Sequence, residues 1–367
     1  MVLKDNSKEK WVLKEHTRVK HEILKQYLKA WIPILGSWNK RICYFDCFAG
    51  RGEYEDGTIG SPLIAMEIAG EMSDYIDQLT CVFIEKDSDN FDNLKKVVEQ
   101  NISKYPNVKP IYVNDEFANA ANKLLNFAER TGKNLIPSFF FIDPFGFKGV
   151  PFDIIKRIMS FQTVEVFINF MTRDLARFLN LQNLENNIDD LFGSVQWRSI
   201  IYNKLFGYNK EVALRDLYIN QLREEANVKY VWPFRVCLPE KRQTLYYLIH
   251  ATNHIKGIKK MKEVMYNQGT EGMFAYLGPD DCSNLKHMQL FDPDYLELKN
   301  HLVSKYANKI ITFDQLIEQT IMDSPCLEKH HRQAIKELSI EGKVVVEPVS
   351  SKTKRGLKGN DIIKFLN

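Results

Sequence analysis

The chain has 367 residues, a formal net charge of +3 and a hydrophobic content of 44%. These values exclude a disordered chain, and the length predicts a large core with an added lobe, or two domains. The small net charge does not identify a nucleic-acid partner, because a basic face can coexist with a neutral remainder. No stretch approaches the roughly 18 apolar residues of a membrane span. The six cysteines form no C-x-x-C pair, so we expect a cytoplasmic protein with reduced thiols and no metal.

The first part of the chain predicts an α/β domain. Apolar residues at helical spacing over 15–35 indicate an amphipathic helix within an N-terminal helical segment, residues 1–40. Strand and helix patterns then alternate. The strands are expected at 42–46, 79–85, 108–114, 136–143 and 164–170, and the helices at 61–72, 89–104, 117–130 and 152–160. This alternation implies right-handed crossovers and a doubly wound, Rossmann-like parallel sheet, whose ligands bind at the carboxyl ends of the strands.

The middle of the chain predicts a helical insertion and the end of the sheet. Residues 173–228 read as one helix after another, far more than a crossover requires. The β-rich runs 230–239 and 244–252 follow, separated by a polar segment short enough for an antiparallel hairpin. We therefore expect one reversed strand, with a Rossmann-like domain over 41–172 and 229–270.

Residues 295–367 predict a small winged helix-turn-helix unit, because three helical patterns precede two strands joined by a basic loop. The expected nucleic-acid contacts on its third helix and loop are Lys329, Arg332, Lys352, Lys354, Arg355 and Lys358. Such an arrangement can bind phosphates. The alternative is a protein-interaction module whose charged loop is only solvated.

The first predicted strand ends at Asp46 and is followed by F-A-G-R-G. Gly50 and Gly52 allow the backbone to approach a ligand closely. The third glycine of a dinucleotide-binding motif is replaced by Glu55, and an acid would repel a pyrophosphate. The turn therefore favours a ligand without phosphates. S-adenosylmethionine, with an ammonium group and ribose hydroxyls, meets that description.

Two further acids end the next strands. Glu85 can accept hydrogen bonds from the ribose hydroxyls, and Asp115 can reach the adenine amine, although an isolated Asp after a strand is more often a helix N-cap. Additional cofactor contacts are expected from Phe48, Ala49, Ser61 and Lys86. Ser61 also reads as the N-cap of its helix. His16, Arg18, Lys20 and His21 can shield the cofactor, but we interpret them as a solvated basic face.

The tetrapeptide Asp143, Pro144, Phe145, Gly146 follows a buried strand and is the predicted catalytic motif. The Asp143 carboxylate and the Pro144 carbonyl are two acceptors for the two hydrogens of an exocyclic base amine. Such bonds favour the pyramidal geometry that frees the amine lone pair. Phe145 can stack on a base swung out of its helix. The alternative is a loop without chemistry.

Together, Y-F-D-C-F-A-G-R-G-E-Y, F-I-E-K-D and I-D-P-F-G resemble class I methyltransferases that modify exocyclic amines of nucleobases. Over residues 15–267 the chain resembles more closely the three-Cys-motif partner protein family. It is also similar to ribosomal RNA adenine methyltransferases. It is similar as well to tRNA guanine dimethyltransferases, whose catalytic tetrapeptide is D-P-F-G, as in this chain. The resemblance implies S-adenosylmethionine as cofactor and a small three-cysteine-motif protein as partner. It also makes 46–52 the cofactor turn and 143–146 the catalytic tetrapeptide.

The sequence therefore predicts an S-adenosylmethionine-dependent N-methyltransferase that acts on adenine or guanine in DNA or RNA. A second hypothesis is a catalytically idle binding protein with the same fold, in which the winged helix regulates. A nicotinamide oxidoreductase is disfavoured by the missing third glycine and the reversed final hairpin. The adjacent His330 and His331 point about 100° apart on a helix, so we expect no metal there.

Overall fold

A computed structural model describes residues 13–202, 209–238, 243–269, 275–276, 293–349 and 356–366. The chain forms two compact units: Met1–Thr270 with Phe274–Pro279, and Glu271–Met273 with Asp280–Asn367. Within the described ranges, no helix is long and apolar enough to cross a membrane. Each unit has its own sheet.

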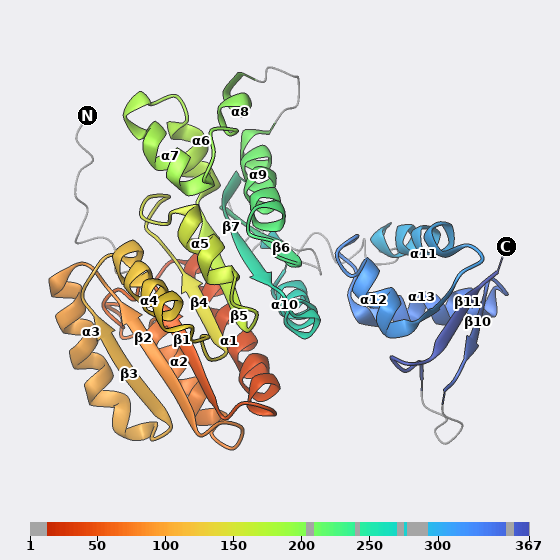
Figure 1. The fold of residues 1–367 in the computed structure, drawn as a ribbon, viewed down its shortest axis with the longest axis horizontal. Helices are drawn as coiled ribbons and strands as arrows, with labels where there is room; N and C mark the ends of the chain where they lie inside the picture. Colours follow the sequence, from red (N-terminus) through yellow and green to blue (C-terminus); the bar gives the residue numbers. More distant parts are fainter. Residues whose placement is uncertain are drawn as a thin grey trace. The chain divides into compact units, whose positions relative to one another are not determined.

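A mostly parallel sheet forms the centre of the first unit (Figure 1). In chain order its strands are β1 (Arg41–Asp46), β2 (Gln78–Ile84), β3 (Val108–Val113), β4 (Ser138–Ile142), β5 (Val164–Phe170), β6 (Tyr230–Leu238), β7 (Gln243–Thr252) and β8 (Ala275–Tyr276). Their spatial order is β3-β2-β1-β4-β5-β7-β6-β8, and β7 runs antiparallel to both of its neighbours. The predicted doubly wound, Rossmann-like sheet with one reversed strand is confirmed. The two residues of β8 were not expected, because so short a strand has no periodicity.

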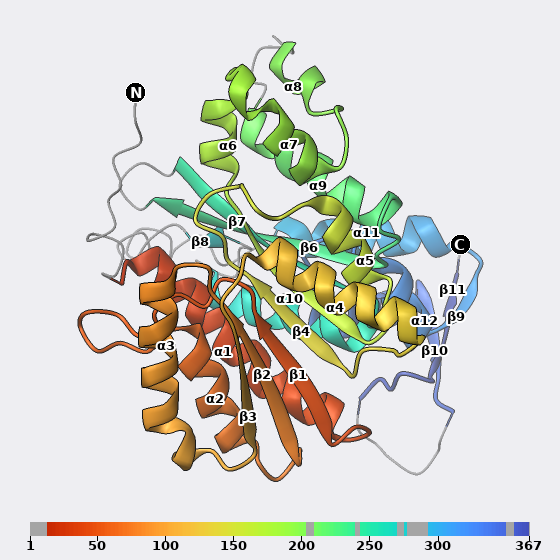
Figure 2. The same cartoon turned by 60° about the vertical axis from the view of Figure 1, so that its left-hand side comes forward.

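Helices cover both faces of this sheet (Figure 2). One face carries α1 (Glu15–Gly36), α2 (Ser61–Glu71), α3 (Ser88–Asn101) and α10 (Ile255–Gln268), and the other carries α4 (Phe117–Thr131) and α5 (Phe152–Met159). Strand residues alternate between the two cores: Ile42 and Tyr44 of β1 join the first, and Cys43 and Phe45 join the second. Because both faces are buried, the strands read as continuous apolar runs.

The predicted helical insertion contains α6 (Thr172–Phe178), α7 (Glu185–Phe192), α8 (Arg198–Tyr202) and α9 (Lys210–Glu224). Its apolar side chains are not a separate core. Trp197 and Tyr218 belong to the same buried cluster as Phe140 of β4, and Phe170 of β5 stacks on Tyr218 with ring centroids 4.5 Å apart. The insertion therefore extends the helical layer on one face of the sheet.

A buried polar cluster attaches α1 to the sheet. Glu165 of β5 accepts a hydrogen bond of 2.5 Å from the Tyr27 hydroxyl, and His250 Nε2 of β7 lies 2.8 Å from the same oxygen. All three side chains are buried. A Cβ at Gly257 of α10 would come within 2.9 Å of that oxygen, so glycine is needed there. Burying a carboxyl group is tolerated only when it is hydrogen-bonded, so this cluster holds α1 in one position.

We expect Tyr27→Phe to lower the free energy of unfolding by about 1–3 kcal/mol, because Glu165 loses a buried donor. Tyr218→Phe is the matched control: Tyr218 is also buried, but its hydroxyl has no hydrogen-bond partner among the described residues. Urea unfolding of both variants measures the difference. Equal effects of the two substitutions would show that the Glu165 cluster does not stabilise the fold.

The described part of the second unit contains three helices and a three-stranded sheet. In chain order these are α11 (Pro293–Tyr306), β9 (Ile310–Thr312), α12 (Phe313–Thr320), α13 (Glu328–Ile340), β10 (Val344–Glu347) and β11 (Ile362–Phe365). The sheet is antiparallel in the order β10-β11-β9. A capping box between Thr312 and Gln315 begins α12. The three residues of β9 were not expected from the sequence, and a winged helix-turn-helix remains our prediction for this unit.

Candidate active site

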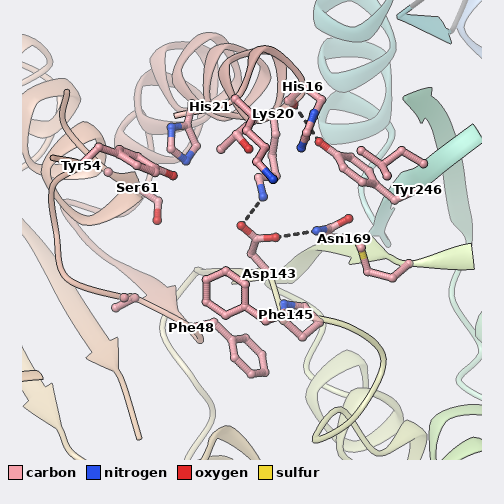
Figure 3. A pocket seen from close by; sticks show the side chains of 18 of the residues that line it. His16, Lys20, His21, Phe48, Tyr54, Ser61, Asp143, Phe145, Asn169 and Tyr246 are labelled. Carbon is pink, nitrogen blue, oxygen red and sulfur yellow. Dashed lines mark hydrogen bonds and ion pairs between the residues drawn. The ribbon is translucent and has the colours of Figure 1, made fainter. Parts of the chain in front are cut away.

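The strand register brings the predicted catalytic motif beside the glycine turn. Asp46 of β1 is level with Phe141 of β4, and Ile142 is level with Ile168 of β5. Asp143 therefore leaves the sheet between Asp46 and Asn169. A cavity of about 470 Å³ opens at this edge and is bordered by the turn, by the catalytic motif and by α1 (Figure 3).

The turn after β1 requires glycine at two positions. Gly50 and Gly52 have φ values of +62° and +85°, which side-chain-bearing residues rarely adopt. A Cβ at Gly52 would also lie 3.2 Å from Leu94 Cδ1 of α3. The Gly50 N–H donates a 2.9 Å hydrogen bond to Glu85 Oε2, which fixes the turn against the end of β2. Gly50, Gly52 and Ala49 all line the cavity, as predicted.

Asp46 is fully buried beneath this turn. Burial raises the pKa of its carboxyl to about 7, against the lowering effect of the Ser61 and Tyr44 hydroxyls. Tyr44 donates to Oδ2 at 3.2 Å, whereas Oδ1 has no partner within the described part of the chain. Asp46 thus holds an unused acceptor. Ser61 lines the cavity, but Gly60 is the N-cap of α2, so our assignment of Ser61 as the cap was one residue too late.

A second cavity, of about 400 Å³, contains the other two predicted acids. Glu85, Lys86 and Asp115 line it, and Phe48 and Phe145 line both cavities. The two cavities therefore adjoin at these two aromatic side chains. The helix α7 of the insertion also contributes to the wall of the second cavity.

The two carboxyl groups of this second cavity differ in environment. Burial raises the pKa of Glu85, whose oxygens accept from the N–H groups of Gly50 and Asp87. Asp115 accepts a 2.7 Å hydrogen bond from Lys123, which lowers its pKa. Glu116 is the N-cap of α4, so the N-cap alternative for Asp115 is wrong.

Both oxygens of the Asp143 carboxylate are engaged (Figure 3). Oδ1 accepts a 2.7 Å hydrogen bond from Asn169 Nδ2, and Oδ2 forms an ion pair with Lys20 Nζ of α1. Phe145, two residues on, is 72% exposed at the mouth of the cavities. Gly146 has a φ of +105°, which lets the chain turn away behind Phe145.

The expected solvated basic face of α1 was wrong for Lys20 and His21, which are both buried. Burial and the nearby Lys20 lower the pKa of His21 to about 3, so its imidazole is neutral at pH 7. The sequence carried a signal for this. Lys20 lies on the apolar stripe of Leu24, Tyr27 and Trp31, at helical spacing, and all of these residues pack on the sheet.

Other residues of the site were not singled out from the sequence. Asn169 interrupts the otherwise apolar end of β5, and Tyr246 lies on the neighbouring β7. The Tyr246 hydroxyl donates a 2.7 Å hydrogen bond to the His16 carbonyl, which anchors the start of α1 beside the cavity. Tyr246 could not have been assigned before the strand order was known. Among the described residues, no group of three or more His, Cys, Asp or Glu side chains is placed to hold a metal ion.

In the second unit, Lys329, Arg332 and Lys358 line a groove of about 760 Å³ between α13 and β10. Arg332 is held within the unit: it donates to Glu328 and to the Leu357 carbonyl, and its guanidinium lies 4.5 Å from the centre of the Phe313 ring. Lys336, which was not predicted, lies on the same face of α13 and is exposed. Lys352, Lys354 and Arg355 are outside the described residues.

Several solved structures are similar to this chain. Precorrin-6y C5,15-methyltransferase from Geobacter metallireducens GS-15 is 10% identical, with 67% of this chain and 92% of that chain covered and a TM-score of 0.30. PKMT2 from Rickettsia typhi, in complex with AdoHcy, is 9% identical, with 65% and 55% covered and a TM-score of 0.29. Coclaurine N-methyltransferase, bound to N-methylheliamine and SAH, is 7% identical, with 62% and 70% covered and a TM-score of 0.26. The sequence matches no protein-family model and no curated protein.

We expect Asp46→Asn to change how stability depends on pH. The pKa of Asp46 is about 7 in the folded protein and about 4 in an unfolded chain. The folded state therefore binds the proton more tightly, and the wild type loses up to about 4 kcal/mol of stability as the pH rises from about 4 to about 7. The asparagine variant does not titrate, so its free energy of unfolding relative to wild type should rise over that range.

Urea unfolding at pH 5 and pH 8 measures this difference, with Asp153→Asn as the control at an exposed aspartate. A constant difference between Asp46→Asn and wild type at the two pH values would contradict the raised pKa.

Proposed function

We propose that this protein is a methyltransferase that transfers the methyl group of S-adenosylmethionine to an exocyclic amine of a nucleic-acid base. One observation carries the proposal. The Asp143 carboxylate and the glycine turn border one cavity, and Phe48 and Phe145 join that cavity to a second one containing Glu85 and Asp115. The donor and the acceptor of a methyl group can therefore lie next to each other.

The chain's residues fit the cofactor. The second cavity has room and two carboxylates for an adenosine, Glu85 for the ribose hydroxyls and Asp115 for the adenine amine. Gly50 and Gly52 have positive φ values and line the first cavity, so backbone without side chains forms part of its wall. Asp46, which we expected to bind the cofactor, is fully buried and lines neither cavity, so it supports the turn from beneath. When bound, the cofactor supplies an electrophilic methyl group.

The residues at the end of β4 can prepare the acceptor amine. Asp143 and the Pro144 carbonyl accept its two hydrogens, and Phe145 offers a face on which the base can stack. Held in this way, the amine would direct its lone pair toward the methyl group that the bound cofactor would supply. The amine loses one proton, for which Asp143 is the nearest carboxylate acceptor.

Basic side chains support a nucleic-acid substrate. Lys14 and Arg173 line the first cavity together with Lys20. In the second unit, Lys329, Lys336 and Lys358 border the groove beside α13, as expected for a winged helix that binds phosphates. We propose that both units contact the same nucleic acid. The small three-cysteine-motif partner implied by the sequence resemblance remains a proposal.

Calorimetric titration with S-adenosylmethionine and labelled methyl transfer to DNA and RNA pools test the proposed activity. We expect one-to-one cofactor binding by the wild type. Asp143→Ala should abolish transfer and change cofactor affinity by no more than a few fold, because Asp143 contacts the acceptor amine and not the cofactor.

Asp153→Ala, at an exposed aspartate, is the control and should retain activity. Loss of cofactor binding by Asp143→Ala would make Asp143 a structural residue. Cofactor binding without transfer to either pool by the wild type would favour the catalytically idle binding protein.

The second unit is tested by Lys329→Gln/Lys336→Gln in the full-length chain. Each lysine that neutralises a phosphate adds nearly one unit to the slope of log affinity against log salt. We expect that slope to fall by about 2 and the affinity to fall roughly uniformly across sequences. Lys305→Gln/Lys309→Gln removes two charges elsewhere in the unit and should leave the slope unchanged. Identical slopes for both variants would assign the groove to protein contacts.

A further inference from the structure

We infer that Lys20 recognises the base: it donates a hydrogen bond to the unprotonated ring nitrogen beside the target amine. The substrate base is then adenine or cytosine and not guanine. This inference rests on the proposed function and narrows its substrate. It depends on a contact that the sequence did not predict, the ion pair between Lys20 of α1 and the catalytic Asp143.

Lys20 is held in place from several sides. Its side chain is 7% exposed, and its Nζ lies 5.9 Å from the centre of the Tyr246 ring. The helix that carries it is anchored near its start by the hydrogen bond from Tyr246 to the His16 carbonyl, and further along by Tyr27 and Glu165. A buried ammonium fixed in this way acts as a directed donor, unlike the freely moving end of a surface lysine.

The ion pair places a donor directly beside an acceptor. Oδ2 of Asp143 accepts one of the three N–H groups of Lys20, and Oδ1 accepts from Asn169. Each carboxylate oxygen has a second lone pair, so Asp143 can still accept from an amine. Lys20 and Asp143 both line the first cavity. A ligand in that cavity therefore meets an acceptor from Asp143 and a donor from Lys20 at adjacent positions.

Adenine and cytosine match this pair of groups. In adenine the N6 amine is next to N1, and in cytosine the N4 amine is next to N3; each presents a donor beside an acceptor on its Watson–Crick edge. The amine can donate to Asp143 while the ring nitrogen accepts from Lys20. Two bonds at one edge fix the orientation of the base as well as its identity.

Guanine does not match. Beside its N2 amine, the Watson–Crick edge carries N1–H, a donor that would face the ammonium of Lys20. Its other neighbour, N3, lies on the side of the sugar, where the ribose restricts approach. A carboxylate can bind N1–H and N2–H with its two oxygens, but at Asp143 that pairing would bring N1–H against the Lys20 ammonium, which already donates to Oδ2. The same tetrapeptide as in guanine enzymes therefore occurs here in an environment that disfavours guanine.

The first experiment identifies the labelled nucleoside. DNA and RNA pools are treated with the wild-type protein and labelled S-adenosylmethionine, then digested to nucleosides. Label in adenosine or cytidine, or their deoxy forms, supports the inference. Label in guanosine overturns it and leaves the proposed methyltransferase function in place. If the protein binds the cofactor but labels no nucleoside, the proposed function fails, and the inference fails with it.

The second experiment tests Lys20 directly. For an adenine substrate, an oligonucleotide of the labelled sequence is compared with one that has 1-deazaadenine at the target, which replaces N1 by C–H and keeps the amine. For a cytosine substrate, 3-deazacytosine serves. The wild type should lose about 10- to 100-fold in kcat/KM and in affinity measured by fluorescence anisotropy with S-adenosylhomocysteine. For Lys20→Met, the natural and the deaza substrates should differ by no more than about threefold in kcat/KM and in affinity.

Lys20→Gln keeps a hydrogen-bond donor and should retain part of the preference for the natural base over its deaza analogue. Lys29→Met, which removes a lysine of the same helix that pairs with Glu71 at 2.8 Å, should behave as wild type. Cofactor affinity shows whether each variant is folded. If Lys20 only orients Asp143, the deaza substitution will cost the same in wild type and in Lys20→Met, and that result would overturn the inference.

Discussion

The site depends on the register of three adjacent parallel strands. Because β1, β4 and β5 are aligned, the residues that follow their apolar runs emerge at one edge of the sheet, where Asp46, Asp143 and Asn169 lie close together. A shift by one residue in any strand would turn these side chains to the opposite face. The ion pair to Lys20 and the two cavities depend on this arrangement of the strand ends.

The helix α1 turns that edge into an enclosed site. It lies outside the alternating strand and helix pattern, yet it is joined to β5 and β7 through Glu165, Tyr27 and His250. These contacts bury polar groups, which is tolerated because Glu165 Oε2 is hydrogen-bonded to both the Tyr27 hydroxyl and His250 Nε2. As a result Lys20 lies beside Asp143 and is held there as a hydrogen-bond donor. A single helix therefore forms one wall of the first cavity and places the positive charge of Lys20 beside Asp143.

Much of the site could be predicted from local patterns. Glycines at a sharp turn, acids after buried strands and the D-P-F-G tetrapeptide each carry a local physical meaning. The structure places most of them around two adjoining cavities, whereas Asp46 and Gly146 line neither. Residues such as Asn169 and Tyr246 could not be assigned in this way. Their position depends on which strands are neighbours, and the pairing of β7 with β5 is a long-range contact with no local signal.

The sequence by itself determined the sheet, its single reversed strand and the residues of the glycine turn, because periodicity and backbone requirements are local properties. Only the tertiary structure decided that Lys20 is buried and paired with Asp143, and that α6–α9 share the core of the sheet. A helix with a charged residue on its apolar stripe has an amphipathic sequence pattern in either case, whether that residue is exposed to solvent or paired with a carboxylate. Which of the two it meets depends on the partner across the fold, and that partner lies 123 residues away in the chain.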